Sequence, residues 1–277
     1  MRIRPRYGTA PVITYEDDLA SVAAPAVRQR LRLAKTVARF GPAQWQAPSR
    51  CAGWTNRDVV IHLASVNRFW IHSINEGRRG TPTRMLDAFD PVATPAGLVA
   101  AAGNPSPADV LDAFLGSTHA LTDLLSTLTD DEWSMLAESP LGHVSISAVV
   151  RHALWDAWIH ERDISLGLGD LPVVEADEVD AALRCVAALG PAFGVLLGTL
   201  DDRQLTATLT TADPTVAFTI AVAQTVRVAA GVDPAAPVAV HGRAVAVLEG
   251  LSQRTPLTLQ PEWHWLTAGL EQAFETG

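Results

Sequence analysis

The hydrophobic pattern of the 277-residue chain changes once, near residue 170, and that change constrains the fold more than any other feature. Before it, apolar residues recur at the spacing of amphipathic helices, with Gly and Pro between the periodic segments. Four helices are predicted there, over residues 15–39, from Thr55 to about residue 76, over 107–128 and over 145–167. Four helices joined by short to medium loops predict a bundle.

After Gly169 the pattern differs. A helix is predicted over residues 175–196, and four segments with the two-residue alternation of half-buried strands follow it, at 205–209, 216–220, 225–228 and 238–240. Helices near 243–252 and 261–275 complete the chain. We therefore expect an α+β protein of two domains, an all-α domain over residues 15–169 and a smaller α+β domain over residues 170–277.

The segment between the second and third helices, residues 77–107, is rich in Gly, Pro, Thr and Arg, with a short helical or irregular stretch near Met85 to Phe89. It is long enough to form a pocket rim or a lid. The second helix has a clear start, because Thr55 can cap it and the Asp58 carboxylate can reach back to the Thr55 amide. Asp58 is therefore interpreted as a cap rather than as a catalytic group.

Composition narrows the class of partners. With 48% hydrophobic residues the chain can bury a core, and its net charge of -9 argues against binding to nucleic acid. Its two cysteines, Cys51 and Cys185, are too few and too far apart for a disulfide framework, which favours a reducing cytoplasm. The first eight residues lack the apolar stretch of a secretory signal, and no run reaches the ~18 apolar residues that span a membrane. We expect a cytoplasmic protein with neither a nucleic-acid nor a membrane partner.

Asp156 and His160 are four residues apart in the predicted fourth helix, which places a carboxylate and an imidazole on one face. His62, in the predicted second helix, is the candidate third ligand, because metal sites in bundles are built from facing helices. Three N or O ligands with one open position are typical of catalytic zinc. The spacing alone is not specific, since a hydrogen bond on the helix surface explains Asp156 and His160 equally well.

His152 extends the same stripe, four residues before Asp156. Because a helix rises about 1.5 Å per residue, ligands spread over this stripe would span about 12 Å, too far for one ion. We assign Asp156 and His160 as ligands and leave His152 to orient a ligand or to contact substrate. Asp163, three residues after His160, could orient its imidazole, although a solvated carboxylate at the end of a helix fits nearly as well.

Two segments, Gln44–Pro48 and Cys51–Leu63, resemble the N-terminal signature of the mycothiol-dependent maleylpyruvate isomerase family, a branch of the DinB-like four-helix metalloproteins. The segment Trp155–Ile164 resembles the second signature of that family, in which an acidic residue precedes a histidine by four positions and an aspartate follows it by three. The resemblance covers residues 15–170 well. The remainder resembles, only in general terms, the sterol-carrier-like α+β domain that follows in the family.

The resemblance implies a divalent metal, usually zinc, held by the positions that match His62, Asp156 and His160. It also implies mycothiol, the low-molecular-weight thiol of actinobacteria, as cosubstrate. The family more often has Glu where this chain has Asp156, and the shorter side chain must reach the metal by a small helix shift or through water. A metal-bound thiol loses its proton near neutral pH and becomes a nucleophile, from which either cis-trans isomerisation or S-transfer to a small electrophile can begin.

A polar or acidic substrate would need a cationic anchor. Arg254 is the candidate, because it matches by position an arginine near the end of the family's second domain. Arg227 and Arg243 are alternatives, and a surface ion pair is the plainer interpretation of each. Cys51 precedes a helix N-terminus, where a thiol can be acidified, but an ordinary loop cysteine is expected. Five histidines have no partner recognisable from spacing: His72, His119, His143, His241 and His264.

Three functions fit these residues. The first is a metal-dependent enzyme, an isomerase or S-transferase, that activates a low-molecular-weight thiol. The second is a non-catalytic module that binds a metal or an apolar ligand. The third is a metal-dependent hydrolase, in which metal-bound water would have to act because no Gly-x-Ser-x-Gly motif is present.

Overall fold

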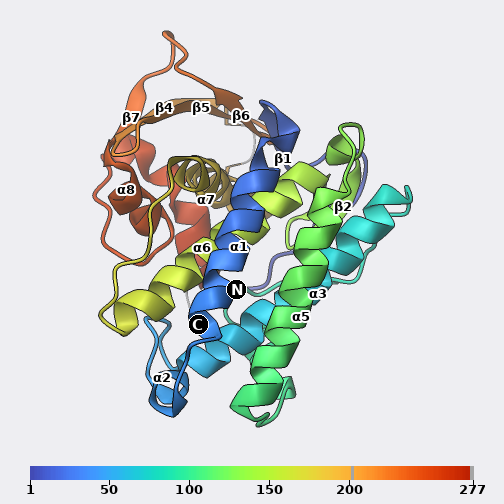
Figure 1. Ribbon diagram of the computed structural model, residues 1–277. Helices are drawn as coiled ribbons and strands as arrows, with labels where there is room; N and C mark the ends of the chain where they lie inside the picture. The colour runs from blue at the N-terminus through green and yellow to red at the C-terminus, as the bar shows by residue number, and fades with distance from the viewer. Residues whose placement is uncertain (201–202, 275–277) are drawn as a thin grey trace.

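The computed structural model describes residues 1–200 and 203–274, in which long helices pack beside a five-stranded sheet (Figure 1). The α-helices are α1 (Ala23–Val37), α2 (Pro42–Gln46), α3 (Asn56–Arg78), α4 (Ala93–Ala101), α5 (Pro107–Ser126), α6 (Ile146–Gly167), α7 (Ala176–Leu196), α8 (Ala244–Leu251) and α9 (Ala268–Phe274). Short 3-10 helices are η1 (Leu19–Val22), η2 (Glu132–Ser134) and η3 (Pro261–Leu266).

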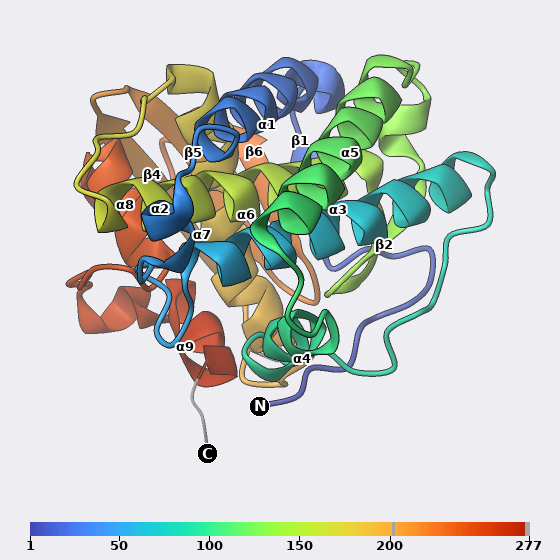
Figure 2. The ribbon, with the colours of Figure 1, turned by 60° about the horizontal axis from the view of Figure 1, so that its bottom comes forward.

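The helices α1, α3, α5 and α6 pack side by side, with α1 and α3 each in contact with both α5 and α6 (Figures 1 and 2). Their starts are set locally. The Thr55 side chain accepts from the amide of Asp58, and the Asp58 carboxylate accepts from the Thr55 amide at 2.9 Å, which confirms the predicted capping box at α3. Ser106 and Asp109 form the same capping box at α5, and the Ser145 side chain caps α6 by accepting from the amide of Ala148. These caps fix where α3 and α6, which carry the predicted metal ligands, begin.

The sheet has the strand order β1-β6-β5-β4-β7, and its strands are β1 (Ile13–Glu16), β4 (Leu205–Ala212), β5 (Val216–Val222), β6 (Val226–Ala230) and β7 (Val238–Arg243). The outer pairs β1/β6 and β4/β7 are parallel, and the inner pairs are antiparallel. A separate hairpin joins β2 (Leu136–Ser139) and β3 (Gly142–Ser145) ahead of α6. The molecule is therefore a mixed helix and sheet protein.

Helix α7 connects the helices to the sheet. It contacts α6 on one side and β5 and β6 on another, and it is long and apolar enough to cross a membrane by length and composition. Since 89% of its most apolar window is buried inside the protein, its composition is that of a core helix. It lies so close to the C-terminal helical segment that a Cβ on Gly190 would sit 2.0 Å from the Leu266 carbonyl oxygen.

The start of the chain differs from the sequence prediction. The helix predicted over residues 15–39 begins only at Ala23, because Ile13–Glu16 form β1 and pair with β6 instead. One hydrophobic cluster continues from Ile13 and Tyr15 through α6 and α7 into the sheet. Near the other end, the helix predicted over 261–275 is divided into η3 and α9, and residue 275 lies outside the described residues.

A buried carboxylate holds the segment between α3 and α4. Glu138, on β2, has no exposed surface and accepts hydrogen bonds from the hydroxyls of Tyr7 and Thr83, both at 2.6 Å, and from the amides of Met85 and Leu86, both at 2.9 Å. Burial opposes its charge, but these donors outweigh that effect and lower its pKa. The irregular stretch predicted near Met85 is therefore an ordered loop that leads into α4.

A candidate metal site and its pocket

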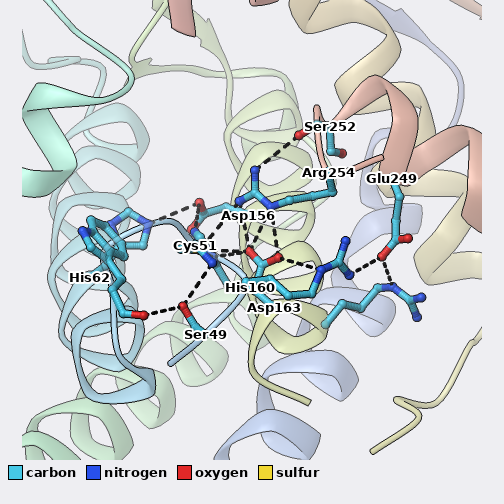
Figure 3. A network of polar contacts seen from close by, with 12 residues as sticks. Ser49, Cys51, His62, Asp156, His160, Asp163, Glu249, Ser252 and Arg254 are labelled. Carbon is cyan, nitrogen blue, oxygen red and sulfur yellow. Dashed lines mark hydrogen bonds and ion pairs between the residues drawn. The ribbon is translucent and has the colours of Figure 1, made fainter. Parts of the chain in front are cut away.

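The three predicted ligands lie together where α3 faces α6 (Figure 3). Asp156 Oδ1 is 3.3 Å from His62 Nε2 and 3.5 Å from His160 Nε2, and donor atoms of the three residues all lie within 4.8 Å of one another. The rings of His62 and His160 are 5.0 Å apart, centroid to centroid. A carboxylate and two imidazoles thus converge on one small volume.

These distances fit a small divalent ion. Ligands about 2.1 Å from a tetrahedral zinc are about 3.4 Å from one another, which is close to both separations around Asp156 Oδ1. The second oxygen, Oδ2, is buried and has no hydrogen-bond partner within residues 1–200 and 203–274. An unpaired buried carboxylate oxygen is costly, and a cation is a natural partner for it. Despite the shorter side chain, Asp156 Oδ1 comes within 3.5 Å of both imidazoles.

The other face of His160 is oriented by Asp163. The Nδ1–H of His160 donates to Asp163 Oδ2 at 3.1 Å, so when the ring gives up its other proton the lone pair lies on Nε2, the atom that faces Asp156. A carboxylate that fixes the tautomer and the ring of a histidine ligand is a common element of zinc sites. The sequence allowed two interpretations of Asp163, one as the partner that orients His160 and one as a solvated carboxylate at the end of a helix. In the structure Asp163 has no exposed surface, so it is not solvated.

Asp163 is also the centre of a wider polar network (Figure 3). Arg254 donates to it through Nε at 3.0 and 3.1 Å and through Nη2 at 3.0 Å. The Cys51 thiol donates to it at 3.1 Å and lies 3.5 Å from His160 Nδ1. Burial would raise the pKa of Asp163, but His160 and Arg254 hold it well below its usual range.

The pKa values of two ligand groups are strongly shifted. Burial would raise the pKa of Asp156, but His62 and His160 hold it well below its usual range. Burial disfavours a charged His160, yet Cys51, Asp163 and Asp156 together raise its pKa to about 10. Protons and metals compete for such nitrogens, so a metal that binds here displaces a proton.

His152 is not within hydrogen-bonding distance of the ligands. Its ring packs between Trp70 and Trp155, with centroids 5.3 and 5.5 Å away, and it lines the pocket. Burial lowers its pKa to about 4, against the opposing effect of Asp156. His152 was expected either to orient a metal ligand or to contact substrate. Its position on the pocket wall is compatible with contact to substrate.

The alternative anchors lie on the surface. Arg227 is 55% exposed and pairs with Glu16, and Arg243 is 79% exposed and lies 3.9 Å from Asp213. Arg254, in contrast, lines the pocket and is only 22% exposed. It is the one of the three that shares a cavity with the predicted ligands.

Two residues of this site carry no role in the sequence prediction. Arg50 lines the pocket and donates to Glu249 at 2.7 Å, and Glu249 also accepts from Arg162 at 3.0 Å. Cys51, expected to be an ordinary loop cysteine, contacts His160 and Asp163 instead. The only signal in the sequence was the position of Cys51 at the start of the second segment of the first family signature, and Arg50 lies between the two segments.

The site opens into a cavity of about 610 Å³. Its walls come from α3, α6, α7, α9, the loop before α3, the turn after α8, and the segment from Phe89 to Ala96. The predicted rim between the second and third helices is therefore part of the wall. The cavity is large enough for a drug-sized ligand or for two smaller molecules.

Fold and site together define a class of protein. It is a mixed helix and sheet protein in which two histidines and a carboxylate converge at a pocket. Two solved structures share the fold: the mycothiol-dependent maleylpyruvate isomerase, 16% identical with a TM-score of 0.58, and a His-to-Ala variant of it, 15% identical with a TM-score of 0.59. Each alignment covers 87% of this chain and 92% of the other. No curated protein sequence matches.

A family model, the mycothiol maleylpyruvate isomerase N-terminal domain, matches residues 26–165, which is half of the chain. The chain belongs to this family, as its two sequence signatures predicted. The matched segment contains all three predicted ligands as well as Cys51 and Asp163.

Proposed function

We propose that this chain is a metal-dependent enzyme that uses a low-molecular-weight thiol, mycothiol, as the nucleophile in cis-trans isomerisation or S-transfer of a small electrophile. The observation that carries the proposal is the convergence of three donor groups within 4.8 Å of one another beside a cavity of about 610 Å³, with Asp156 Oδ1 at 3.3 and 3.5 Å from the two imidazole nitrogens. Membership of the family adds support, since its name and the similar solved structures refer to mycothiol and to maleylpyruvate isomerase.

In this proposal His62, Asp156 and His160 hold a divalent ion, and two imidazoles with one carboxylate are a donor set typical of zinc. When bound, the ion supplies a lowered pKa and a fixed position for the sulfur of the thiol. Asp163 keeps His160 in the tautomer that presents Nε2, and Arg254 neutralises Asp163. His152 is a candidate substrate contact on the wall.

Arg254 has a second role in the proposal. Its Nε and Nη2 are occupied by Asp163, while Nη1 makes only a 3.4 Å contact with the Ser252 carbonyl within the described part of the chain. Nη1 is therefore available to a carboxylate or carbonyl oxygen of the electrophile. Attack by the thiolate forms a C–S bond while the π electrons move onto that oxygen. Expulsion of the thiolate after rotation gives the isomer, and expulsion of another group gives transfer.

We further propose a functional division at residues 169 and 170, in which residues 15–169 form a DinB-like metal-binding bundle and residues 170–277 form a sterol-carrier-like domain that supplies Arg254 and part of the pocket wall. Residues 201–202 and 275–277 of the second unit lie outside the described residues. Both cysteines are free thiols, which suits a reaction in the reducing cytoplasm.

The test is thiol-dependent turnover by the purified chain. With the metal loaded, mycothiol should bind by isothermal titration and should support either isomerisation of a cis-enoyl acid or formation of its thioether. Stripping the metal should abolish both. Asp156→Asn should behave as the stripped protein does, and Asp170→Asn, which replaces an exposed carboxylate just after α6, should behave as wild type.

Each alternative function predicts a different outcome. Hydrolysis of esters by the metal-loaded protein without any thiol would identify a hydrolase. A protein that binds neither metal nor thiol would be a ligand-binding module, and the proposal would be wrong.

A further inference from the structure

The pocket has two unlike walls. The wall near the predicted ligands is polar, and Arg50, Cys51 and Arg254 lie on it. The wall made by α7, α9 and the segment leading into α4 is apolar, and Phe89, Val92, Ala96, Leu189, Phe193 and Leu270 lie on it. Figure 2 shows α4 and α9 on the same side of the molecule. A polar thiol fits the first wall, which leaves the second for the other reactant.

The polar wall has a definite charge balance. Arg254 pairs with Asp163, while Arg50 and, behind the wall, Arg162 both pair with Glu249, so three guanidinium groups share two carboxylates. Among these five groups one positive charge remains, and the remaining carboxylate of the wall, Asp156, is assigned to the metal ion. A buried charge is stable only when an opposite charge lies beside it. The remaining positive charge can therefore pair with one carboxylate of a ligand, and a second carboxylate would have no partner.

The apolar wall is preformed. Leu189 and Phe193 are one turn apart on α7 and are 1% and 3% exposed, and Leu270 on α9 is 2% exposed. The helices α7 and α9 pack backbone against backbone, because a Cβ on Gly269 would meet the Gly190 carbonyl oxygen at 2.2 Å. Such direct backbone packing keeps the wall in place, so an apolar ligand gains burial there without a large rearrangement.

We infer that the electrophile of this enzyme carries at most one carboxylate and an extended apolar chain, and that the chain lies against Leu189, Phe193, Leu270 and the α4 segment. The carboxylate or carbonyl oxygen is placed at Arg254 Nη1, and the reacting double bond lies between the two walls. A small dicarboxylate would leave the apolar wall empty and would bring a second negative charge close to Asp163 or Asp156. This inference rests on the proposed thiol-dependent function and names its substrate class.

Maleate and its monomethyl, monobutyl and monohexyl esters form a matched set of probes. All have the same cis double bond, maleate has two carboxylates, and the esters have one carboxylate and an alkyl chain of increasing length. With the metal-loaded protein and mycothiol, kcat/KM should be lowest for maleate and should rise up to about fourfold per buried methylene until the wall is covered. Values that are flat with chain length, or highest for maleate, would overturn the inference.

Two further measurements separate this inference from the proposed function. The saturated monohexyl ester of succinic acid cannot react, and it should bind more tightly than succinate by titration. If the methyl ester turns over with thiol but chain length has no effect on turnover or on binding, only the substrate class is wrong. If no probe turns over with thiol, the proposed function fails, and the substrate class fails with it.

One substitution tests where the alkyl chain of the substrate lies. Ala96→Trp fills the apolar wall from α4 and should raise KM for the hexyl ester while leaving the methyl ester nearly unchanged. Ala101→Trp is the control, because Ala101 is exposed on the same helix and is not among the residues that line the cavity. An equal effect of both variants on both esters would place the alkyl chain elsewhere.

Discussion

Replacing Asp163 by Asn removes the negative charge that orients His160 without changing the size of the side chain. The carboxylate accepts from His160 Nδ1 at 3.1 Å and from two nitrogens of Arg254 at 3.0 Å, and it has no exposed surface. An Asn amide supplies one acceptor oxygen and places an NH₂ against one of these donors. His160 would lose the contact that keeps its lone pair on Nε2.

The magnitude follows from these contacts. Outer partners of a histidine ligand are typically worth 10- to 100-fold in metal affinity, or about 1.4–2.7 kcal/mol. Removing one partner of a buried ion pair costs about 3–5 kcal/mol, and the lower end applies here because Arg254 retains 22% exposure. We therefore expect Asp163→Asn to bind zinc about 10- to 100-fold more weakly and to lose about 3 kcal/mol of unfolding free energy.

Zinc affinity is measured by competition with a chromophoric chelator, and stability by urea unfolding of the metal-free protein. Asp180→Asn is the matched control, since Asp180 pairs with Arg184 on α7 but is 35% exposed and is not among the cavity-lining residues. A folded Asp163→Asn protein with the zinc affinity of wild type would refute the role assigned to Asp163. Equal losses of affinity in both variants would refute it as well.

Three other predictions test the fold and the ligand set. Glu138→Gln should lower the free energy of unfolding by about 3 kcal/mol in urea, because an amide nitrogen cannot accept from donors that the buried carboxylate now satisfies. The folded-state pKa of Glu138 lies below its ordinary value of 4.5, so its contribution is complete above about pH 4.5 and is lost as the pH falls through the folded-state pKa. The stability difference between wild type and Glu138→Gln should therefore shrink in acid, and a difference that widens there would contradict this sign. Asp156→Glu should weaken zinc binding at least about threefold, because Asp156 Oδ1 already has the spacing of a tetrahedral ligand and the longer side chain must bend away; tighter binding by this variant would show that Asp156 does not reach the ion.

The helices were predictable because their information is local. Apolar stripes and caps identified α3, α5, α6 and α7 from sequence, with ends that agree within about two residues with the structure. Strand β1 could not be found in this way, because Ile13–Glu16 become a strand only through pairing with β6, more than two hundred residues further along the chain. Because apolar residues at helical spacing follow directly after it, residues 15 and 16 of this strand were included in one longer predicted helix.

The site shows the same contrast. The spacing of Asp156 and His160 is a helical period, and His62 stood out through a family signature, so these three could be named from sequence. Cys51 and Arg50 lie on a loop, and Glu249 comes from α8, so no periodicity relates them to α6. Their contacts with Asp163, His160 and Arg162 depend on how loops and helices pack in three dimensions.

The central claim is that His62, Asp156 and His160 together hold one metal ion. The most direct test is the metal content of the purified protein by mass spectrometry, compared with His62→Ala and with His72→Ala, an exposed histidine on the same helix. The account predicts about one divalent ion per chain in wild type and in His72→Ala, and almost none in folded His62→Ala. Full metal occupancy in His62→Ala would contradict it.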